Sequence, residues 1–450
     1  MEGDFIKINK WLLPLSWCYG VAVNFRNTLF SIGILKSRSF NVPIISVGNI
    51  TVGGTGKTPH VEYLIKLLKD KCHVAVLSRG YKRKSNGYIK ATAQTTMPEI
   101  GDEPYQMKQK FPDITVAVDQ NRCHGIDQLT SDDAQLDVIL LDDAFQHRYV
   151  KPGINILLVD YHRLVIYDTL LPAGRLREPL SGKDRADIVI VTKCPQNLKP
   201  MEYRVITKAM NLYPYQQLFF TTLKYGELQP LFPKLAQPAQ LEQLQSQHVL
   251  LLTGIASPEQ MVNDLSPLTA HLSPLTFSDH HEFKRKDIEL INETFAALPS
   301  PKTIVTTEKD ATRLLTTTGL SEEVCKNLYV LPIEICFMQE QHTTFNNQIL
   351  SYVHKNSRNS ILAKSKDDHK SHDSNRAGNR PRTISFRNNL QARDSLRRNS
   401  QLPRIYRRGT RRCTHLRQTR RHRHHGHAGP LPLLRGLLDE GSNVPRTRNV

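Results

Sequence analysis

The sequence predicts an α/β fold: a doubly wound, mostly parallel sheet followed by a second, smaller α/β domain. Short apolar runs rich in β-branched residues and leucine alternate with helical stretches from residue 42 onward. A shorter alternation of the same kind begins near residue 249, after a stretch rich in proline and glutamine. With 450 residues, of which 39% are apolar, the chain is long enough to bury a substantial core.

The runs of the first region are largely apolar on both faces, as is typical of parallel strands covered by helices on each side. They are Ile44–Val47, Val74–Leu77, Thr115–Val118, Val138–Leu141, Ile154–Val159 and Ile188–Val191. Apolar residues at i, i+3, i+4 and i+7 predict an amphipathic crossover helix over 60–70. The smaller region is expected to hold strands at 249–253, 303–306 and 328–333, and a helix near 286–297.

Four segments follow from these patterns. We expect an N-terminal interfacial helix over 1–36, a core domain over 37–235, a smaller C-terminal α/β domain over 236–355, and a basic tail over 356–450. From residue 371 the tail holds 19 arginines, no lysine and four acids, so it carries most of the formal charge of +19. This composition is typical of a disordered extension or of translation in a shifted reading frame.

The seven cysteines are scattered and form no C-x-x-C pair. This spacing disfavours a disulfide framework and a zinc site, and it fits a reducing compartment.

An uncharged stretch runs from Trp11 to Phe25 between Lys10 and Arg26. It is too short to span a bilayer, which takes about 20 helical residues. The acidic start of the chain also disfavours a secretory signal. Aromatic residues and leucine flanked by basic residues predict a helix lying in an anionic membrane surface; the alternative is a helix packed on the protein's own core.

The strongest local signal is the stretch Thr51-Val52-Gly53-Gly54-Thr55-Gly56-Lys57-Thr58, between a predicted strand and a predicted helix. In that context a glycine-rich turn directs backbone N–H groups at phosphate oxygens, beside the positive end of the helix. Lys57 would reach the β- and γ-phosphates of ATP, and Thr58 would hold Mg²⁺. Thr51 stands where the usual pattern begins with glycine. The sequence therefore predicts a P-loop NTPase-like core.

A phosphate-binding loop needs an acidic partner for its metal, at the end of a neighbouring strand. Asp142 and Asp143 follow the run Val138–Leu141 and are the candidates for this Mg²⁺ site. Read alone, the pair could be a plain turn, but the phosphate-binding loop upstream favours the metal site.

Five motifs, in order and spacing, resemble the lipid A 4'-kinase (tetraacyldisaccharide 4'-kinase) family. They are Ser46–Ile50 before the loop, Ser78–Tyr81, Gly101–Pro104, Asp142–His147 and Leu171–Pro179. The resemblance runs from about residue 10 to about 355, through Asp279-His280 and Thr307–Asp310. Ala144 departs from the family, which mostly has glycine there, so this position is expected to avoid positive φ.

The resemblance implies an enzyme that transfers the γ-phosphate of ATP to the 4'-hydroxyl of a tetraacyldisaccharide 1-phosphate in lipid A biosynthesis. It implies that Asp102 accepts the proton of that hydroxyl, paired with a histidine, for which His280 is preferred over His281. The candidates for binding the anionic glycolipid are Arg79, Tyr81, Gln146, His147 and Arg177, with Arg122 and Arg175 in neighbouring loops. The expected protein is a monomer, peripheral on the cytoplasmic face of the bacterial inner membrane, with no nucleic-acid partner.

Two other functions remain open at this point. A regulatory NTPase without a lipid substrate would need the same loop, but Thr192–Pro195 lacks the aspartate of the guanine-reading N-K-x-D pattern. A nucleic-acid-binding protein would rest on the arginine-rich tail alone.

Overall fold

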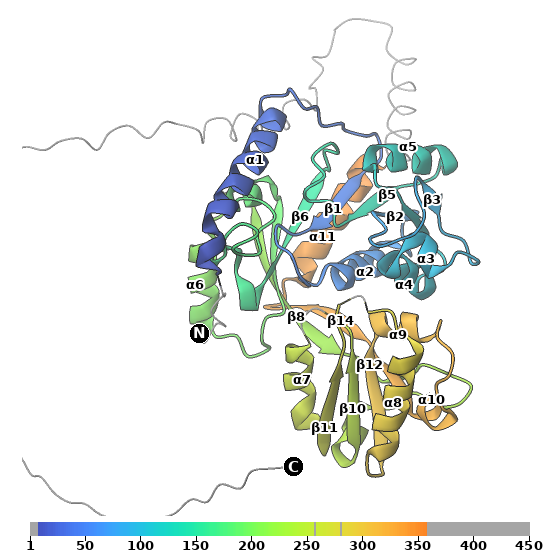
Figure 1. Ribbon diagram of the computed structural model, residues 1–450. Helices are drawn as coiled ribbons and strands as arrows, with labels where there is room; N and C mark the ends of the chain where they lie inside the picture. Colours follow the sequence, from blue (N-terminus) through green and yellow to red (C-terminus); the bar gives the residue numbers. More distant parts are fainter. Residues whose placement is uncertain (1–7, 256–257, 280, 358–450) are drawn as a thin grey trace, which may run out of the picture. The chain divides into compact units, whose positions relative to one another are not determined.

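In the part of the chain that the structure describes, the larger of two sheets has nine strands and carries the P-loop. The computed structural model describes residues 8–255, 258–279 and 281–357 (Figure 1). In spatial order the strands are β14 (Ile333–Phe337), β8 (Gln217–Tyr225), β7 (Ile188–Thr192), β6 (Ile154–Asp160), β1 (Ile44–Gly48), β5 (Val138–Asp142), β2 (Val74–Ser78), β4 (Thr115–Val118) and β3 (Ile89–Lys90). The two edge strands, β14 and β3, run antiparallel to their neighbours, and the others are parallel. The predicted α/β fold is confirmed.

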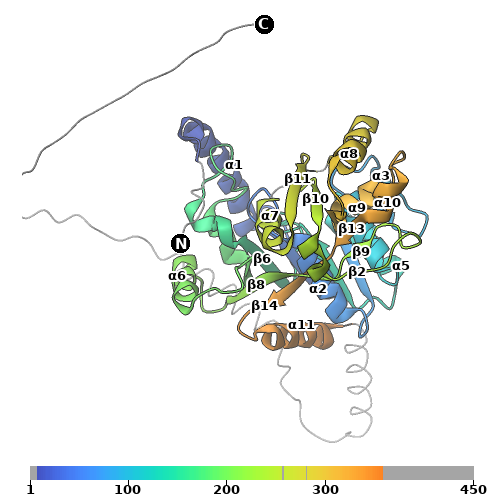
Figure 2. The ribbon, with the colours of Figure 1, turned by 90° about the horizontal axis from the view of Figure 1, so that it is seen from below.

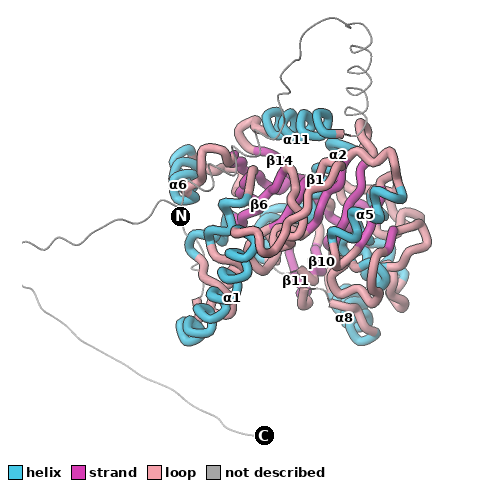
Figure 3. Tube along the Cα trace, turned by 90° about the horizontal axis from the view of Figure 1, so that it is seen from above, coloured by secondary structure: helices cyan, strands magenta, loops and turns pink. Residues whose placement is uncertain are grey.

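Helices cover both faces of this sheet, as Figure 3 shows. One face packs on α2 (Lys57–Leu68), α4 (Asp102–Lys110) and α11 (His342–Asn356), through residues such as Val61, Met107 and Ile349. The other face packs on α5 (Arg122–Asp132) and α6 (Pro200–Met210). Strands buried on both sides favour apolar residues on both faces, which explains the largely apolar runs of the sequence.

The smaller sheet has five strands. Their order is β11 (His271–Thr276), β10 (His248–Thr253), β12 (Lys302–Thr307), β13 (Leu328–Leu331) and β9 (Gln229–Pro230), of which β9 is antiparallel. It packs on α7 (Glu259–Leu265) and α8 (Arg285–Ala297), with α9 (Glu308–Leu314) and α10 (Glu322–Asn327) following β12. Apart from the N-terminal helix, the other helical elements of the described residues are α3 (Met97–Ile100) and the 3₁₀ turns η1 (Lys10–Leu12), η2 (Tyr161–Arg163), η3 (Val165–Tyr167), η4 (Leu180–Arg185), η5 (Leu241–Ser246) and η6 (Ser266–Leu268).

The strand predicted over 328–333 is wrong, because it is two strands that belong to different sheets. Strand β13 ends at Leu331 and pairs with β12, whereas β14 begins at Ile333 and pairs with β8. Pro332 lies between them and has no N–H to donate to a ladder. Helix α11 then returns to the larger sheet and lies beside β14 (Figure 2). There Phe345 packs against Phe337 at a ring-centroid distance of 4.5 Å.

The range predicted for the smaller domain, 236–355, therefore includes β14 and α11, which pack on the larger sheet. Strand β9, from within 37–235, joins the smaller sheet. The division into domains itself stays a prediction, and the predicted tail lies outside the described residues apart from its first two positions.

The predicted N-terminal helix is present as α1 (Leu13–Ser31), which follows η1. One side carries exposed apolar residues, among them Trp17 at 74% and Phe25 at 65% of full exposure. The opposite side buries Ser16, Gly20 and Phe30. Among the described residues, no helix is long and apolar enough to cross a membrane.

Candidate active site

The glycine-rich loop connects β1 to α2, as the sequence predicted. Gly53 has φ 110° and Gly56, the N-cap of α2, has φ 80°, so both adopt backbone conformations that favour glycine. Lys57 and Thr58 form the first turn of α2. The loop therefore ends at a helix N-terminus, where backbone N–H groups without helical partners can bind an anion.

Side chains and backbone from neighbouring strands hold the loop in place. Asn49 Nδ2 donates to Thr55 Oγ1 at 2.8 Å, and Thr192 Oγ1 donates to the Thr55 carbonyl at 3.0 Å. Thr51 forms an antiparallel bridge with Leu176. This extended pairing is compatible with any residue, which explains why threonine can replace the first glycine of the usual pattern here.

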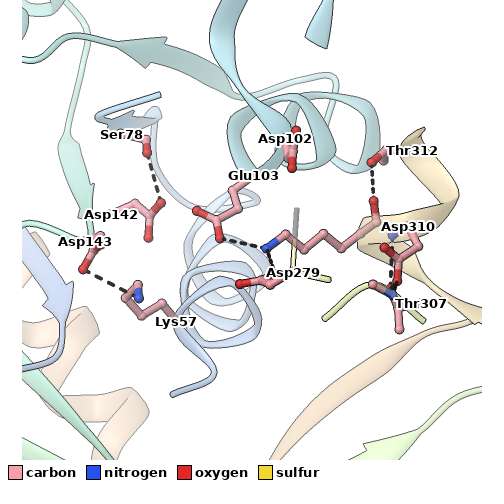
Figure 4. Close-up of polar contacts among 12 residues, drawn as sticks. Lys57, Ser78, Asp102, Glu103, Asp142, Asp143, Asp279, Thr307, Asp310 and Thr312 are labelled. Atoms are coloured by element: carbon pink, nitrogen blue, oxygen red, sulfur yellow. Dashed lines mark hydrogen bonds and ion pairs between the residues drawn. The ribbon is translucent and has the colours of Figure 1, made fainter. Parts of the chain in front are cut away.

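Lys57 points at the acidic pair that ends β5 (Figure 4). Its Nζ lies 3.7 Å from Asp143 Oδ1, and Arg177 Nη1 lies 3.4 Å from Asp143 Oδ2. Burial alone would raise the pKa of Asp143, but Lys57 and Arg177 outweigh it and hold this pKa below its usual value. Asp143, with φ 47°, is the left-handed residue of the turn, and Ala144 avoids positive φ as expected.

Asp142 is almost fully buried, with 1% of its surface exposed. Burial, with the charges of Glu103 and Asp143, raises its pKa to about 7. Ser78 Oγ donates to its Oδ2 at 3.1 Å, whereas its Oδ1 is buried without a hydrogen-bond partner among the described residues. A buried, unpartnered carboxylate oxygen beside a P-loop has the chemistry of a Mg²⁺ ligand, so the site fits that ion.

The candidate glycolipid-binding residues lie on loops next to this acidic pair. Gln146 Nε2 donates to the Asn49 carbonyl. His147 is held neutral: burial first, and then the nearby arginines Arg122, Arg26 and Arg79, lower its pKa to about 4. Its Nε2 is buried without a hydrogen-bond partner among the described residues. Arg79 and Tyr81 are exposed.

The structure places Arg122 inside the site, next to the acidic pair, whereas the sequence indicated only a neighbouring loop. Its side chain is buried, and burial lowers its pKa to about 10 although Asp142 and Asp143 lie nearby. Its Nη1 donates to the Asp119 and Gln120 carbonyls, both at 3.3 Å.

Asp102 begins α4, and its carboxylate is hydrogen-bonded to Arg313 of α9, a helix that packs on the smaller sheet. Its Oδ2 accepts from Arg313 Nη2 at 2.5 Å and from Nε at 3.1 Å. Next to it, Lys309 Nζ lies 3.8 Å from Glu103 and 3.3 Å from Asp279 (Figure 4). Residues far apart in the sequence thus bring the Gly101–Pro104 motif and the Thr307–Asp310 motif together.

The predicted histidine partner of Asp102, His280, lies outside the described residues. Its neighbour His281 is bonded elsewhere: His281 Nε2 lies 2.9 Å from Asp287 Oδ2, and its ring stacks on Phe277.

Sequence reasoning missed Glu103, Lys309 and Arg313 as members of this site. Each lies within or just after a quoted motif, but the motifs alone do not indicate which charges meet. The signal that could have identified them is charge pairing, because acids start α4 and α9 carries Lys309 and Arg313 beside its own acids.

Comparisons with known proteins identify the family to which the chain is similar. Residues 8–354 match the family model described as tetraacyldisaccharide-1-P 4'-kinase. The chain is 60% identical to the tetraacyldisaccharide 4'-kinase of Phocaeicola vulgatus, over 80% of this chain and 99% of that protein. It is 57% identical to that of Bacteroides thetaiotaomicron, over 82% of this chain and all of that protein.

Among solved structures, the chain is similar to LpxK from Aquifex aeolicus, whose crystal structure was determined in complex with ATP. The TM-score is 0.60 and the identity 30%, covering 77% of this chain and 99% of that one. The resemblance inferred from the motifs is confirmed.

Proposed function

The chain belongs to the tetraacyldisaccharide-1-P 4'-kinase family of lipid A biosynthesis, and from that premise we propose how its residues carry out the reaction. The γ-phosphoryl group of ATP passes to the 4'-hydroxyl of a tetraacyldisaccharide 1-phosphate. The bond from the 4'-oxygen to the γ-phosphorus forms, the bond from that phosphorus to the bridging β,γ-oxygen breaks, and ADP leaves. One observation supports this most directly: Lys57, at the N-terminus of α2, faces the acidic pair at the end of β5.

ATP is proposed to bind the loop Thr51–Thr58, with Lys57 neutralising the β- and γ-phosphates. Thr58, Asp142 and Asp143 would hold Mg²⁺, which when bound neutralises developing phosphate charge. The unpartnered Oδ1 of Asp142 supports this assignment. Without a cation an ionised Asp142 is poorly compensated, as its raised pKa indicates.

Asp102 is proposed to accept the proton of the attacking hydroxyl, with His280 as its partner. The bond between His281 and Asp287 supports the choice of His280 over its neighbour. A carboxylate–imidazole pair can act as a general base near neutral pH. Most of the remaining rate enhancement would come from holding the hydroxyl in line with the γ-phosphate.

The glycolipid is proposed to contact Arg79, Tyr81, Gln146, His147 and Arg177. Guanidinium groups suit the 1-phosphate, because their N–H fork matches phosphate oxygens. The buried Nε2 of His147 offers a hydrogen-bonding atom with no partner among the described residues.

Helix α1 is proposed to rest in the interface of the cytoplasmic leaflet of the inner membrane, with its exposed face among the lipids. Its other side is bonded to the site: Tyr19 Oη donates to the Arg177 carbonyl at 2.8 Å, and Arg26 Nη2 donates to the Gln146 carbonyl at 3.1 Å. A lipid drawn from the membrane would thus arrive beside the residues proposed to bind it. We also propose that the protein acts as a monomer and needs no nucleic acid.

The test compares ADP release from MgATP with and without a monophosphorylated tetraacyl disaccharide. We expect release to depend on the lipid, and Asp102→Ala to reduce it by at least about 100-fold, the typical loss when a general base is removed. ADP release that does not respond to the lipid would favour a regulatory NTPase. Deleting residues 371–450 is expected to leave the activity intact, and its loss would implicate the tail.

A further inference from the structure

Helix α9 of the smaller sheet is docked on α4 by ion pairs along its length. Besides Arg313 on Asp102 and Lys309 near Glu103, Glu308 Oε1 lies 2.5 Å from Lys110 Nζ. The pairing runs through both ends of α4, so the two helices meet in a defined register.

Arg313 is the most deeply buried of these charged side chains. Only 4% of its side chain is exposed. Its Nη1 donates to Asp310 Oδ1 at 2.9 Å, and Asp310 is fully buried. The other oxygen of Asp310 accepts from the Gly254 N–H at 2.9 Å and from Thr307 Oγ1 at 2.7 Å. The guanidinium is therefore anchored to the carboxyl ends of β10 and β12.

The backbone of Asp102 is held from the other side, by the larger sheet. Gly101 has φ 90°, and a Cβ there would lie 2.9 Å from the Tyr81 carbonyl oxygen. The close contact with the Tyr81 carbonyl thus restricts the backbone conformation at the start of α4. Two N–H groups of Arg313 donate to the single oxygen Oδ2 of Asp102, and this two-point contact restricts the orientation of the carboxylate.

We propose that Arg313 of α9 is a positioning residue for phosphoryl transfer, which fixes the orientation of the Asp102 carboxylate for proton transfer from the sugar hydroxyl. The inference rests on the proposed role of Asp102 as the proton acceptor. If so, the part of the chain around the smaller sheet contributes Arg313 to the reaction in addition to the proposed His280. A lysine could supply the charge but not the two-pronged geometry.

The experiment measures kcat and KM for ATP in Arg313→Lys and Arg313→Met, with Arg285→Met as the matched control. Arg285 lies on α8 of the same sheet, is 92% exposed and pairs only with Glu289 among the described residues. We expect kcat to fall by about 10- to 100-fold in Arg313→Met, as when a reacting group is displaced by about an ångström. Arg313→Lys should lie between this variant and the parent, and KM for ATP should stay within about 2-fold of the parent value.

Arg313→Met leaves the buried Asp310 without its cation and could unfold the smaller sheet, so thermal unfolding is recorded for every variant. Arg313→Lys keeps a charge beside Asp310 and decides the question if the methionine variant does not fold. Folded Arg313 variants with kcat within about 2-fold of the parent would overturn the proposal.

The same Arg313→Lys change in an Asp102→Ala background separates the inference from its premise. If Arg313 acts through Asp102, single-turnover rates of Asp102→Ala and of the double variant should agree within about 2-fold. Equal losses from Arg313→Lys in both backgrounds would refute the positioning role. If Asp102→Ala keeps the parent rate, the assignment of Asp102 as base fails instead, whatever Arg313 does.

Discussion

Replacing Asp142 by asparagine is expected to stabilise the protein while abolishing its activity. The buried carboxylate of Asp142 has one hydrogen bond, from Ser78, and its pKa is raised from 3.8 to about 7. A shift of about 3 units corresponds to about 4 kcal/mol, at about 1.4 kcal/mol per unit. An asparagine amide needs hydrogen bonds of its own, which costs about 1–3 kcal/mol where they are not made. The net gain at pH 8 is therefore about 1–3 kcal/mol.

The gain depends on pH in a defined direction. Because the folded state binds the proton of Asp142 more tightly than the unfolded chain, the cost of ionising it is fully present above pH 7. That cost declines as the pH falls from about 7 through 3.8, and it vanishes below this value, where the carboxyl is protonated in both states. The difference between Asp142→Asn and the parent should therefore shrink across this window.

The assay is thermal unfolding of parent, Asp142→Asn and the exposed control Asp70→Asn at pH 8 and pH 4.5, without nucleotide or magnesium. Asp70 has 79% of its side chain exposed, so its replacement should change little. A lower melting temperature for Asp142→Asn than for the parent at pH 8, or an equal gain at both pH values, would refute the reasoning. Mg²⁺ with ATP should stabilise the parent but not the variant.

Three further outcomes are expected. Gly56→Ala should lower stability by about 1 kcal/mol and weaken ATP binding in calorimetry, because φ 80° strains a Cβ; unchanged ATP affinity would contradict this. His60→Phe should destabilise by about 1–3 kcal/mol in denaturant unfolding, since His60 Nε2 lies 3.1 Å from the buried Thr221 Oγ1; an unchanged midpoint would count against that pairing. Trp17→Glu should reduce binding to anionic vesicles without changing the melting temperature, while Leu290→Glu on α8 should not; equal binding by both would argue against α1 as the membrane contact.

The core strands could be predicted because burial on both faces requires a run of largely apolar residues within each strand. This signal does not depend on which strand pairs with which. Strand β1 and the loop ending at Gly56 are local, so a short window of sequence contains the whole signal. Strand β11, with exposed and partly exposed residues, has no such mark and was missed. The division at Pro332 was missed because the apolar run continues across it, and only pairing partners tell the two strands apart.

The candidate site divides in the same way. Lys57, Asp142 and Asp143 follow strand ends in the first half of the chain, so topology alone brings them together. Arg313 lies more than two hundred residues after Asp102, and its bond to that carboxylate depends on how α9 docks on α4. No periodicity in the sequence encodes that docking. The sequence therefore indicates the Gly101–Pro104 motif but not its partner Arg313.

The most direct test of the proposed reaction follows label from the γ-phosphate of ATP into the lipid, with the position of the new phosphate determined on the isolated product. The full-length chain should form a disaccharide phosphorylated at the 4'-oxygen when magnesium is present. Lys57→Ala should form it at least about 100-fold more slowly. Label that stays in inorganic phosphate, or enters the lipid at another oxygen, would contradict the account.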